Sequence, residues 1–332
     1  MFLNKIKTGV SGILTYGITP PKEETSTQRI AEIAEKTVAR IKSLDLDALI
    51  VYDVQDESAR TASERPFPFL KALDPFDFAQ QYLQQLPIPK IIYRPAGKYR
   101  SEELSTWLNK LNRHNFFPVF VGLPAPDFPV KTSLPEAYKL WSQLADQSVM
   151  GAVTIPERHA ALNDEDKRIL DKQRCGVSYF ISQCIFDVDY AKQLIEDLCY
   201  TCKKENKKIP TLLFTLSVCG SEKTLRFMEW LGIHIPQKLK KELLESADML
   251  KSSVNICLAI ASTLMEFCTE NSVPFGLNIE SVAIRKDEIE ASIYIVEQIA
   301  AMLDENGIRA SIISSEKKDT GNRFYKKKLI PI

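Results

Sequence analysis

The segment AVTIPERHAALNDEDKRILDKQRCGVSYFISQ, from Ala152 to Gln183, decides the fold. Two short runs at its ends, Ala152–Ile155 and Tyr179–Gln183, are rich in apolar, β-branched and aromatic residues and predict strands. Between them, Asp164–Arg174 predicts a helix. A strand, a helix and a second strand form the unit that joins parallel neighbours, because parallel strands need a long crossover connection. The segment therefore predicts a parallel sheet covered by helices.

The same alternation extends along the chain in both directions. Further helices are predicted at Thr27–Leu44, Ser101–Leu111 and Val188–Lys204, and two consecutive helices within Ile235–Cys268. Ser26 or Thr27 can cap the first of them. The eight predicted strands are Ile13–Tyr16, Ala48–Tyr52, Ile91–Tyr93, Pro118–Gly122, Ala152–Ile155, Tyr179–Gln183, Thr211–Thr215 and Phe275–Ile279.

Eight strands that are each followed by a helix would close a (β/α)8 barrel, with its functional groups at the carboxyl ends of the strands. An open doubly wound sheet is the alternative architecture, but no G-x-G-x-x-G follows the first strand. We therefore expect a single α/β domain, a TIM barrel over residues 1–313, followed by a polar, basic tail over residues 314–332.

The composition argues against several classes of partner. The 43 basic and 43 acidic residues balance, so no overall field favours nucleic acid or an anionic membrane. The longest apolar stretch, Ile256–Met265, is far shorter than the roughly 20 residues of a membrane span, and the N-terminus lacks a signal-peptide core. Seven scattered cysteines fit reduced thiols, and the one C-x-x-C, Cys199 and Cys202, lacks a second pair for zinc. We expect a cytoplasmic protein with a small-molecule ligand, no metal, and a homo-oligomer as one option.

Three stretches between Ile155 and Pro236 carry a more specific signal. Residues 155–159 read Ile-Pro-Glu-Arg-His, and Lys172–Asp187 combines a lysine, a glycine turn, an apolar strand, a Ser-Gln pair and an aromatic-Asp ending. Phe227 is followed nine residues later by Pro236, and near the N-terminus Pro20 and Pro21 follow the first strand. Together these features resemble the methylenetetrahydrofolate reductase family.

The resemblance implies a (β/α)8 barrel of one-carbon metabolism and methionine biosynthesis. Its activity would be the reduction of 5,10-methylenetetrahydrofolate to the 5-methyl form by NAD(P)H, with FAD as the bound cofactor. Gln183 would hydrogen-bond the folate pterin, which suits an amide that both donates and accepts. Phe227 would stack on folate or nicotinamide. His159 and Lys172 would line the flavin.

The chain also departs from the family at several positions. Gly17 stands where the family carries a glutamate proposed to protonate folate, and glycine cannot transfer a proton. Val121-Gly122-Leu123 replaces an Arg-Gly-Asp element near the flavin, and Ile155 replaces an aromatic residue. Three hypotheses remain: a reductase in which NAD(P)H passes hydride directly to folate, a non-catalytic or regulatory folate-binding barrel, and a related tetrahydrofolate methyltransferase.

No residue is assigned as the catalytic acid by the resemblance. Asp53 and Glu57, together with Asp56, follow the second strand and are candidates, because neighbouring carboxylates can raise one another's pKa. A solvated acidic loop is the alternative. These residues belong to the long polar loop Gln55–Asp77, which would lie on the active-site face and could close over it as a lid.

Overall fold

The structure is a computed structural model that describes residues 2–114, 116–123, 129–144 and 149–309. The basic tail expected over residues 314–332 lies outside the described residues. Eight parallel strands close a barrel in which each strand pairs with the next and β8 pairs with β1. The strands are β1 Ile13–Ile18, β2 Ala48–Val51, β3 Lys90–Pro95, β4 Phe116–Val121, β5 Gly151–Thr154, β6 Tyr179–Cys184, β7 Thr211–Ser217 and β8 Phe275–Glu280.

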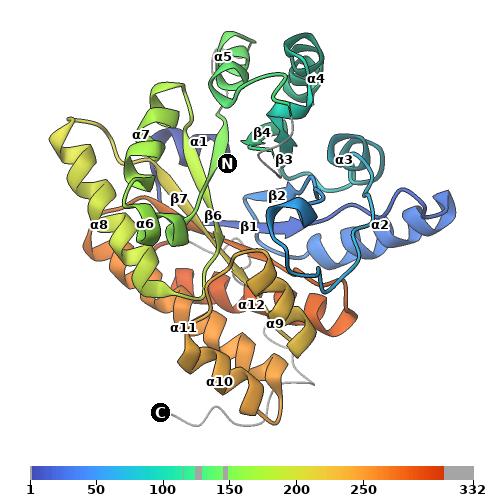
Figure 1. The fold of residues 1–332 in the computed structure, drawn as a ribbon, viewed down its shortest axis with the longest axis vertical. Helices are drawn as coiled ribbons and strands as arrows, with labels where there is room; N and C mark the ends of the chain where they lie inside the picture. Colours follow the sequence, from blue (N-terminus) through green and yellow to red (C-terminus); the bar gives the residue numbers. More distant parts are fainter. Residues whose placement is uncertain (1, 115, 124–128, 145–148, 310–332) are drawn as a thin grey trace.

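Helices surround the barrel on the outside (Figure 1). They are α1 Phe2–Thr8, α2 Thr27–Ile41, α3 Pro75–Tyr82, α4 Ser101–Arg113, α5 Leu134–Leu144, α6 Pro156–Leu162, α7 Glu165–Arg174, α8 Val188–Lys204, α9 Glu222–Trp230, α10 Gln237–Glu245, α11 Met249–Glu270 and α12 Lys286–Glu305. The predicted TIM barrel is therefore confirmed. All eight predicted strands are present, and α10 and α11 are the two consecutive helices expected before the last strand.

The ends of the elements differ from prediction by a few residues. The helix that begins at Thr27 ends at Ile41 rather than Leu44, and Ser26 caps it by accepting a hydrogen bond from the backbone of Arg29. Strand β8 includes Glu280, one residue beyond its predicted end, because Glu280 continues the pairing with Gly17 of β1.

Successive strand residues point alternately into and out of the barrel, and the side chains form two apolar layers. Ile50, Val119 and Ile181 belong to the inner cluster. Their neighbours Leu49 and Phe180 belong to the larger cluster between the strands and the helices. Strands that are buried on both faces read as continuous apolar runs, which is why the sequence identified them.

Helix α1 closes the amino-terminal end of the barrel. Phe2 is fully buried, and its ring lies 5.5 Å from that of Phe117 and 5.4 Å from that of Tyr179, measured between centroids. Phe117 and Tyr179 stand at the beginnings of β4 and β6. Because this end is filled, a ligand site in the barrel belongs at the opposite end.

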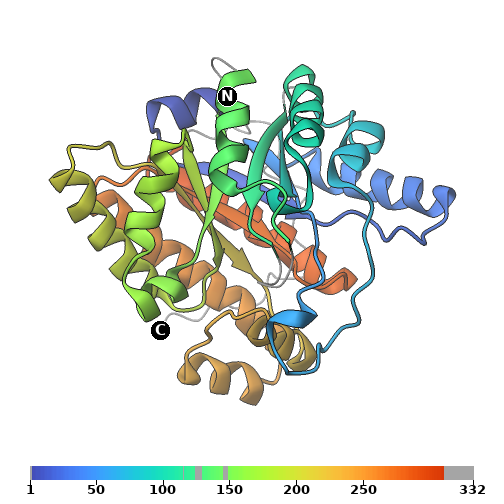
Figure 2. The ribbon, with the colours of Figure 1, turned by 45° about the horizontal axis from the view of Figure 1, so that its top comes forward.

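Among the described residues, α11 is the one helix long and apolar enough to cross a membrane. Half of its most apolar window is buried within the protein, where α11 packs against α8, α12, β7 and β8. This is the arrangement of a core helix in a barrel. The views in Figures 1 and 2 place α11 against the outer side of the strands.

Candidate functional site

A cavity of about 1180 Å³ opens at the carboxyl ends of the strands, and we call it the mouth cavity. This is the end of a TIM barrel where active sites are found. Every strand from β2 to β8 contributes to it, through its last residues or those that follow. Its lining includes Tyr52, Asp53, Tyr93, Val121, Leu123, Val153, Ile155, Arg158, Gln183, Cys184, Thr215, Leu231 and Glu280.

The base of the mouth cavity is built around Glu280 and Tyr52. Glu280 is the last residue of β8, half-buried, and in register with Gly17 on β1. Tyr52 follows β2 and lies over Gly17 so closely that a Cβ on Gly17 would stand 2.6 Å from Tyr52 Cε2. The Tyr52 hydroxyl accepts a hydrogen bond from Asn278 Nδ2 at 2.9 Å and is also hydrogen-bonded to Glu280. Since Asn278 donates to it, the hydroxyl proton of Tyr52 is free to face the Glu280 carboxylate.

This environment changes the protonation of Glu280. Burial raises the pKa of Glu280 to about 7, while the hydrogen bond with Tyr52 acts in the opposite direction. Burial also raises the pKa of Tyr52, so the phenol stays neutral. A carboxyl group with a pKa near neutrality can give or take a proton at physiological pH. Glu280 thus places a carboxyl group that titrates near neutrality in register with Gly17, which has no side chain.

The candidate acids after β2 take different positions. Asp53 and Glu57 line the mouth cavity, whereas Asp56 is exposed. Burial raises the pKa of Asp53 to about 6, against the opposing effect of the Arg94 guanidinium. Asp56 has a lowered pKa, because Ser58 donates hydrogen bonds to its carboxylate. The sequence argument anticipated a raised pKa at this loop, but the physical cause at Asp53 is burial rather than repulsion within the acidic run.

Gln183 lies on the wall of the mouth cavity, as its place at the end of the sixth strand predicts. Its Nε2 donates a hydrogen bond to the backbone oxygen of Leu231 at 3.0 Å, which links β6 to the segment after α9. The residue is half-buried, and its amide has a second N–H and an oxygen besides the donor used by Leu231.

His159 and Lys172 lie outside the mouth cavity, on the helical layer. His159 is fully buried, and its Nε2 lies 2.9 Å from Oδ2 of Asp197 on α8. Lys172 Nζ donates to the backbone oxygen of Val153 at 2.7 Å, and burial lowers the pKa of this lysine to about 8. Helix α7 packs against β5, which places Lys172 on the β5 backbone, and α6 packs against α7 and α8, which places His159 beside Asp197.

The positions that the family resemblance assigns to flavin therefore do not fit a flavin in this structure. His159 and Lys172 are occupied by α8 and by the β5 backbone. Val121, Leu123 and Ile155 line the mouth cavity, where they form apolar wall rather than the charged contacts of the family.

Phe227 lies on α9 under the loop that follows β2, and it is not part of the mouth-cavity lining. It is 8% exposed. Its ring lies 5.3 Å from the ring of Phe67 and 5.9 Å from that of Trp230, and the Arg65 guanidinium stands 5.3 Å above it. The loop is fastened to α9 by a hydrogen bond from Trp230 Nε1 to the backbone oxygen of Ser63 at 3.0 Å. Figures 1 and 2 both show this loop beside α9.

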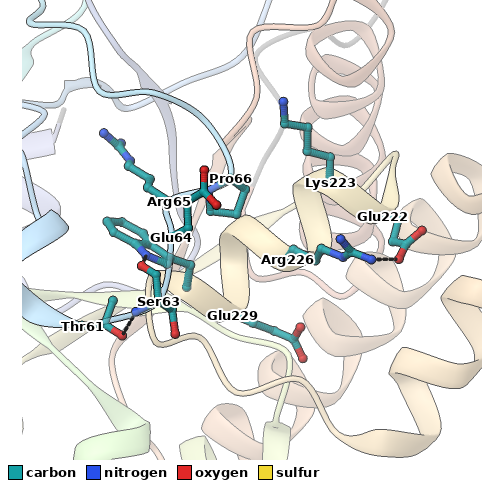
Figure 3. Close-up of a pocket in the computed structure, with 10 residues that line it drawn as sticks. Thr61, Ser63, Glu64, Arg65, Pro66, Glu222, Lys223, Arg226 and Glu229 are labelled. Carbon is teal, nitrogen blue, oxygen red and sulfur yellow. Dashed lines mark hydrogen bonds and ion pairs between the residues drawn. The ribbon is translucent and has the colours of Figure 1, made fainter.

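A second cavity of about 750 Å³ lies between this loop and α9 (Figure 3). One wall is formed by Thr61 and residues 63–66, and the other by Glu222, Lys223, Arg226, Glu229 and Trp230. Trp230 lines the second cavity and its neighbour Leu231 lines the mouth cavity, so one stretch of chain separates the two.

Sequence reasoning missed Glu280, Tyr52 and the second cavity. Glu280 directly follows a predicted strand, and an acidic residue at the carboxyl end of a barrel strand is a signal that could have found it. Its partnership with Tyr52 and Gly17 depends on pairing between the first and last strands, which no local pattern contains.

The sequence and the fold are both similar to those of a protein of known structure. An uncharacterized protein from Clostridium thermocellum that binds two copies of 5-methyl-5,6,7,8-tetrahydrofolic acid has 42% sequence identity and a TM-score of 0.81. The match covers 91% of this chain and 100% of that protein. EDTA monooxygenase from Chelativorans sp. BNC1 matches with a TM-score of 0.51 and 9% identity, over 90% of this chain and 95% of that one, and supports the fold alone.

No protein-family model and no curated protein matches the sequence. The relationship to the Clostridium thermocellum protein extends over that protein's whole length and through the same barrel. On this identity and coverage, the chain belongs to the same family as the folate-binding protein of Clostridium thermocellum.

Proposed function

We propose that this chain binds a reduced folate of the 5-methyltetrahydrofolate class in the mouth cavity. The observation that carries the proposal is the 42% identical relative, which binds 5-methyltetrahydrofolic acid. The end of the barrel where TIM barrels bind their ligands holds a cavity of about 1180 Å³ here. Cavities for ligands of this kind usually measure roughly 300–1,000 Å³, so a folate fits with room to spare.

The lining of the mouth cavity suits a pterin. Val121, Val153 and Leu231 offer apolar surface to the faces of a flat ring. The edge of a pterin carries both donors and acceptors, and the Gln183 amide can meet one of each. Asp53 follows β2, across the barrel from Gln183, and would accept from other pterin N–H groups when ionised. Gln183 and Asp53 therefore orient the ring, and Glu280 lies at the base of the cavity.

A second candidate function, reduction of 5,10-methylenetetrahydrofolate, is favoured by the position of Glu280. In that reaction a proton on N10 breaks the bond from N10 to the methylene carbon, and hydride from NAD(P)H then adds to that carbon to give the 5-methyl group. NAD(P)H supplies the hydride and becomes NAD(P)⁺. Glu280, half-buried and paired with Tyr52, would hold the proton that Gly17 cannot carry. Flavin has no part in this proposal.

Titration calorimetry with 5-methyltetrahydrofolate tests the binding function. We expect the wild-type protein to bind and Gln183→Ala to bind about tenfold or more weakly, because the variant leaves a pterin edge without its partner. Gln85→Ala is the matched control, since Gln85 is exposed and away from the mouth cavity. Absence of binding to the wild type, or equal affinity of the Gln183 variant, contradicts the proposal.

The reductase is tested separately by NAD(P)H oxidation in the presence of 5,10-methylenetetrahydrofolate, without added flavin. We expect turnover that Glu280→Gln reduces at least tenfold while 5-methyltetrahydrofolate still binds. Binding without any turnover identifies a folate-binding barrel that is not this reductase.

A further inference from the structure

The second cavity contains an unusual cation. The Arg65 guanidinium carbon lies 5.3 Å from the ring centroid of Phe69, 5.3 Å from that of Phe227 and 5.2 Å from that of Trp230. Three aromatic rings thus hold it in place through cation–π contacts. Its Nε and Nη1 are buried and have no hydrogen-bond partner in the described part of the chain.

The buried N–H groups of the Arg65 guanidinium lack hydrogen-bond acceptors among the described residues. Such groups normally find carboxylate or carbonyl oxygens, because leaving them unpaired costs more than pairing them gains. The carboxylates of Asp56 and Glu57 act on Arg65 only at a distance, and burial lowers the pKa of the arginine despite them. Arg65 also lines the second cavity, so an anion bound there would lie beside this guanidinium.

The other charges around the second cavity are mostly paired already. Arg226 Nη2 lies 2.6 Å from Glu222 Oε1. Glu229 Oε1 lies 2.6 Å from Lys240 Nζ. Lys223 instead stands over the ring of Phe67, at 4.6 Å from its centroid. Figure 3 shows Lys223 and Arg65 extending from opposite walls, with Glu64 beside Arg65 as the one acidic side chain on the loop wall.

The ligand class follows from these groups. Arg65 and Lys223 call for an anion with more than one carboxylate, and Trp230 offers an aromatic surface beside them. The aminobenzoyl-glutamate part of a folate has this composition: one flat ring and two carboxylates. In the mouth cavity the basic side chain of the lining, Arg158, is already paired with the buried Glu165, at 2.5 Å.

We propose that the second cavity is a second folate site, in which Arg65 and Lys223 bind the glutamate carboxylates and Trp230 contacts the aminobenzoyl ring. The inference rests on the proposed function and deepens it. It gives a location to a second molecule of the kind that the Clostridium thermocellum relative binds. The same chemistry could come from the extended glutamate tail of the folate in the mouth cavity, since one stretch of chain separates the two cavities.

The stoichiometry of 5-methyltetrahydrofolate binding, measured by titration calorimetry, tests the proposal. The wild type should bind two molecules per chain. Arg65→Met and Lys223→Ala should each lose the second molecule, or weaken it about tenfold or more, and keep the first. Gln183→Ala should weaken only the first. Lys238→Ala is the matched control, because Lys238 is an exposed lysine on α10 outside both cavities.

The pterin-free probe p-aminobenzoylglutamate separates the sources of the carboxylates. It should bind the wild type and Gln183→Ala and should fail to bind Lys223→Ala, an exposed position whose replacement leaves the core intact. If the wild type binds one molecule, and Gln183→Ala weakens its binding while the Arg65 and Lys223 variants do not, this inference is overturned. The proposed function is then still supported. If one molecule binds, and both Gln183→Ala and the Arg65 and Lys223 variants lower its affinity, then a single folate reaches from the mouth cavity into the second cavity. That outcome overturns the second site. No binding at all overturns the proposed function itself.

Discussion

Replacing Glu280 by glutamine should make the protein more stable at neutral pH. Burial holds the pKa of Glu280 at about 7, against 4.5 for an ordinary glutamate. The carboxyl is therefore neutral in the folded state at mildly acidic pH, while in the unfolded chain it ionises above its ordinary pKa. Stability consequently falls as the pH rises from about 4.5 to about 7, and above that range the full cost is present.

The magnitude follows from the change in pKa. At 1.36 kcal/mol per pKa unit, a rise from 4.5 to about 7 corresponds to about 3 kcal/mol, which we reduce to about 2 because the carboxyl is half-buried and partly solvated. Glutamine keeps the shape and the hydrogen bond to Tyr52 without the charge. At pH 7.5 we expect Glu280→Gln to raise the free energy of unfolding by about 2 kcal/mol.

The assay is denaturant unfolding of the wild type and of Glu280→Gln at a series of pH values between 4.5 and 8. The two proteins should be equally stable at the acidic end and diverge as the pH rises. Glu270→Gln, an exposed glutamate at the end of α11, is the control and should follow the wild type. If Glu280→Gln keeps the same pH dependence as the wild type, or is less stable at pH 7.5, then Glu280 is not held neutral by its surroundings.

Other substitutions test the remaining parts of the structure. Gly17→Ala should lower stability by about 1–3 kcal/mol, because the new Cβ would collide with Tyr52 at 2.6 Å, and thermal melting measures this against Gly122→Ala, where a Cβ meets nothing within 4 Å. Phe2→Ala should cost about 3–5 kcal/mol in denaturant unfolding, since a fully buried ring is lost; a cost below about 1 kcal/mol would mean that α1 does not close the barrel. Lys172→Met should leave the affinity for 5-methyltetrahydrofolate within about twofold, because the lysine bonds to the β5 backbone and not to the cavity; a large loss in titration calorimetry would return this lysine to the ligand site.

The fold could be predicted from the sequence because each strand is a local signal. Runs such as Ala48–Val51 are buried on both faces, so their apolar character survives without knowledge of their neighbours. The helices between them carry their own caps, as Ser26 shows. Neither signal depends on contacts between distant segments.

Local sequence signals predict only part of the candidate site. Gln183 was predicted from the family resemblance and Asp53 from its place after the second strand, and both line the mouth cavity because the barrel brings the carboxyl ends of its strands together there. His159 and Lys172 were assigned through a family resemblance, and in the structure packing against α8 and β5 takes them away from the mouth. Glu280 and Arg65 were missed, since their roles arise from the pairing of β8 with β1 and from a loop folded onto α9.

The position of α1 has a consequence for how the barrel assembles. Its residues come first in the chain, yet Phe2 docks on Phe117 and Tyr179, whose strands are made much later. The docking surface for Phe2 forms only when β4 and β6 are both paired with β5, the strand between them, so we expect α1 to dock late in folding. We expect Phe2→Ala to accelerate unfolding and to leave the refolding rate nearly unchanged. Stopped-flow measurement of both rates would then show that α1 docks after the rate-limiting step of folding.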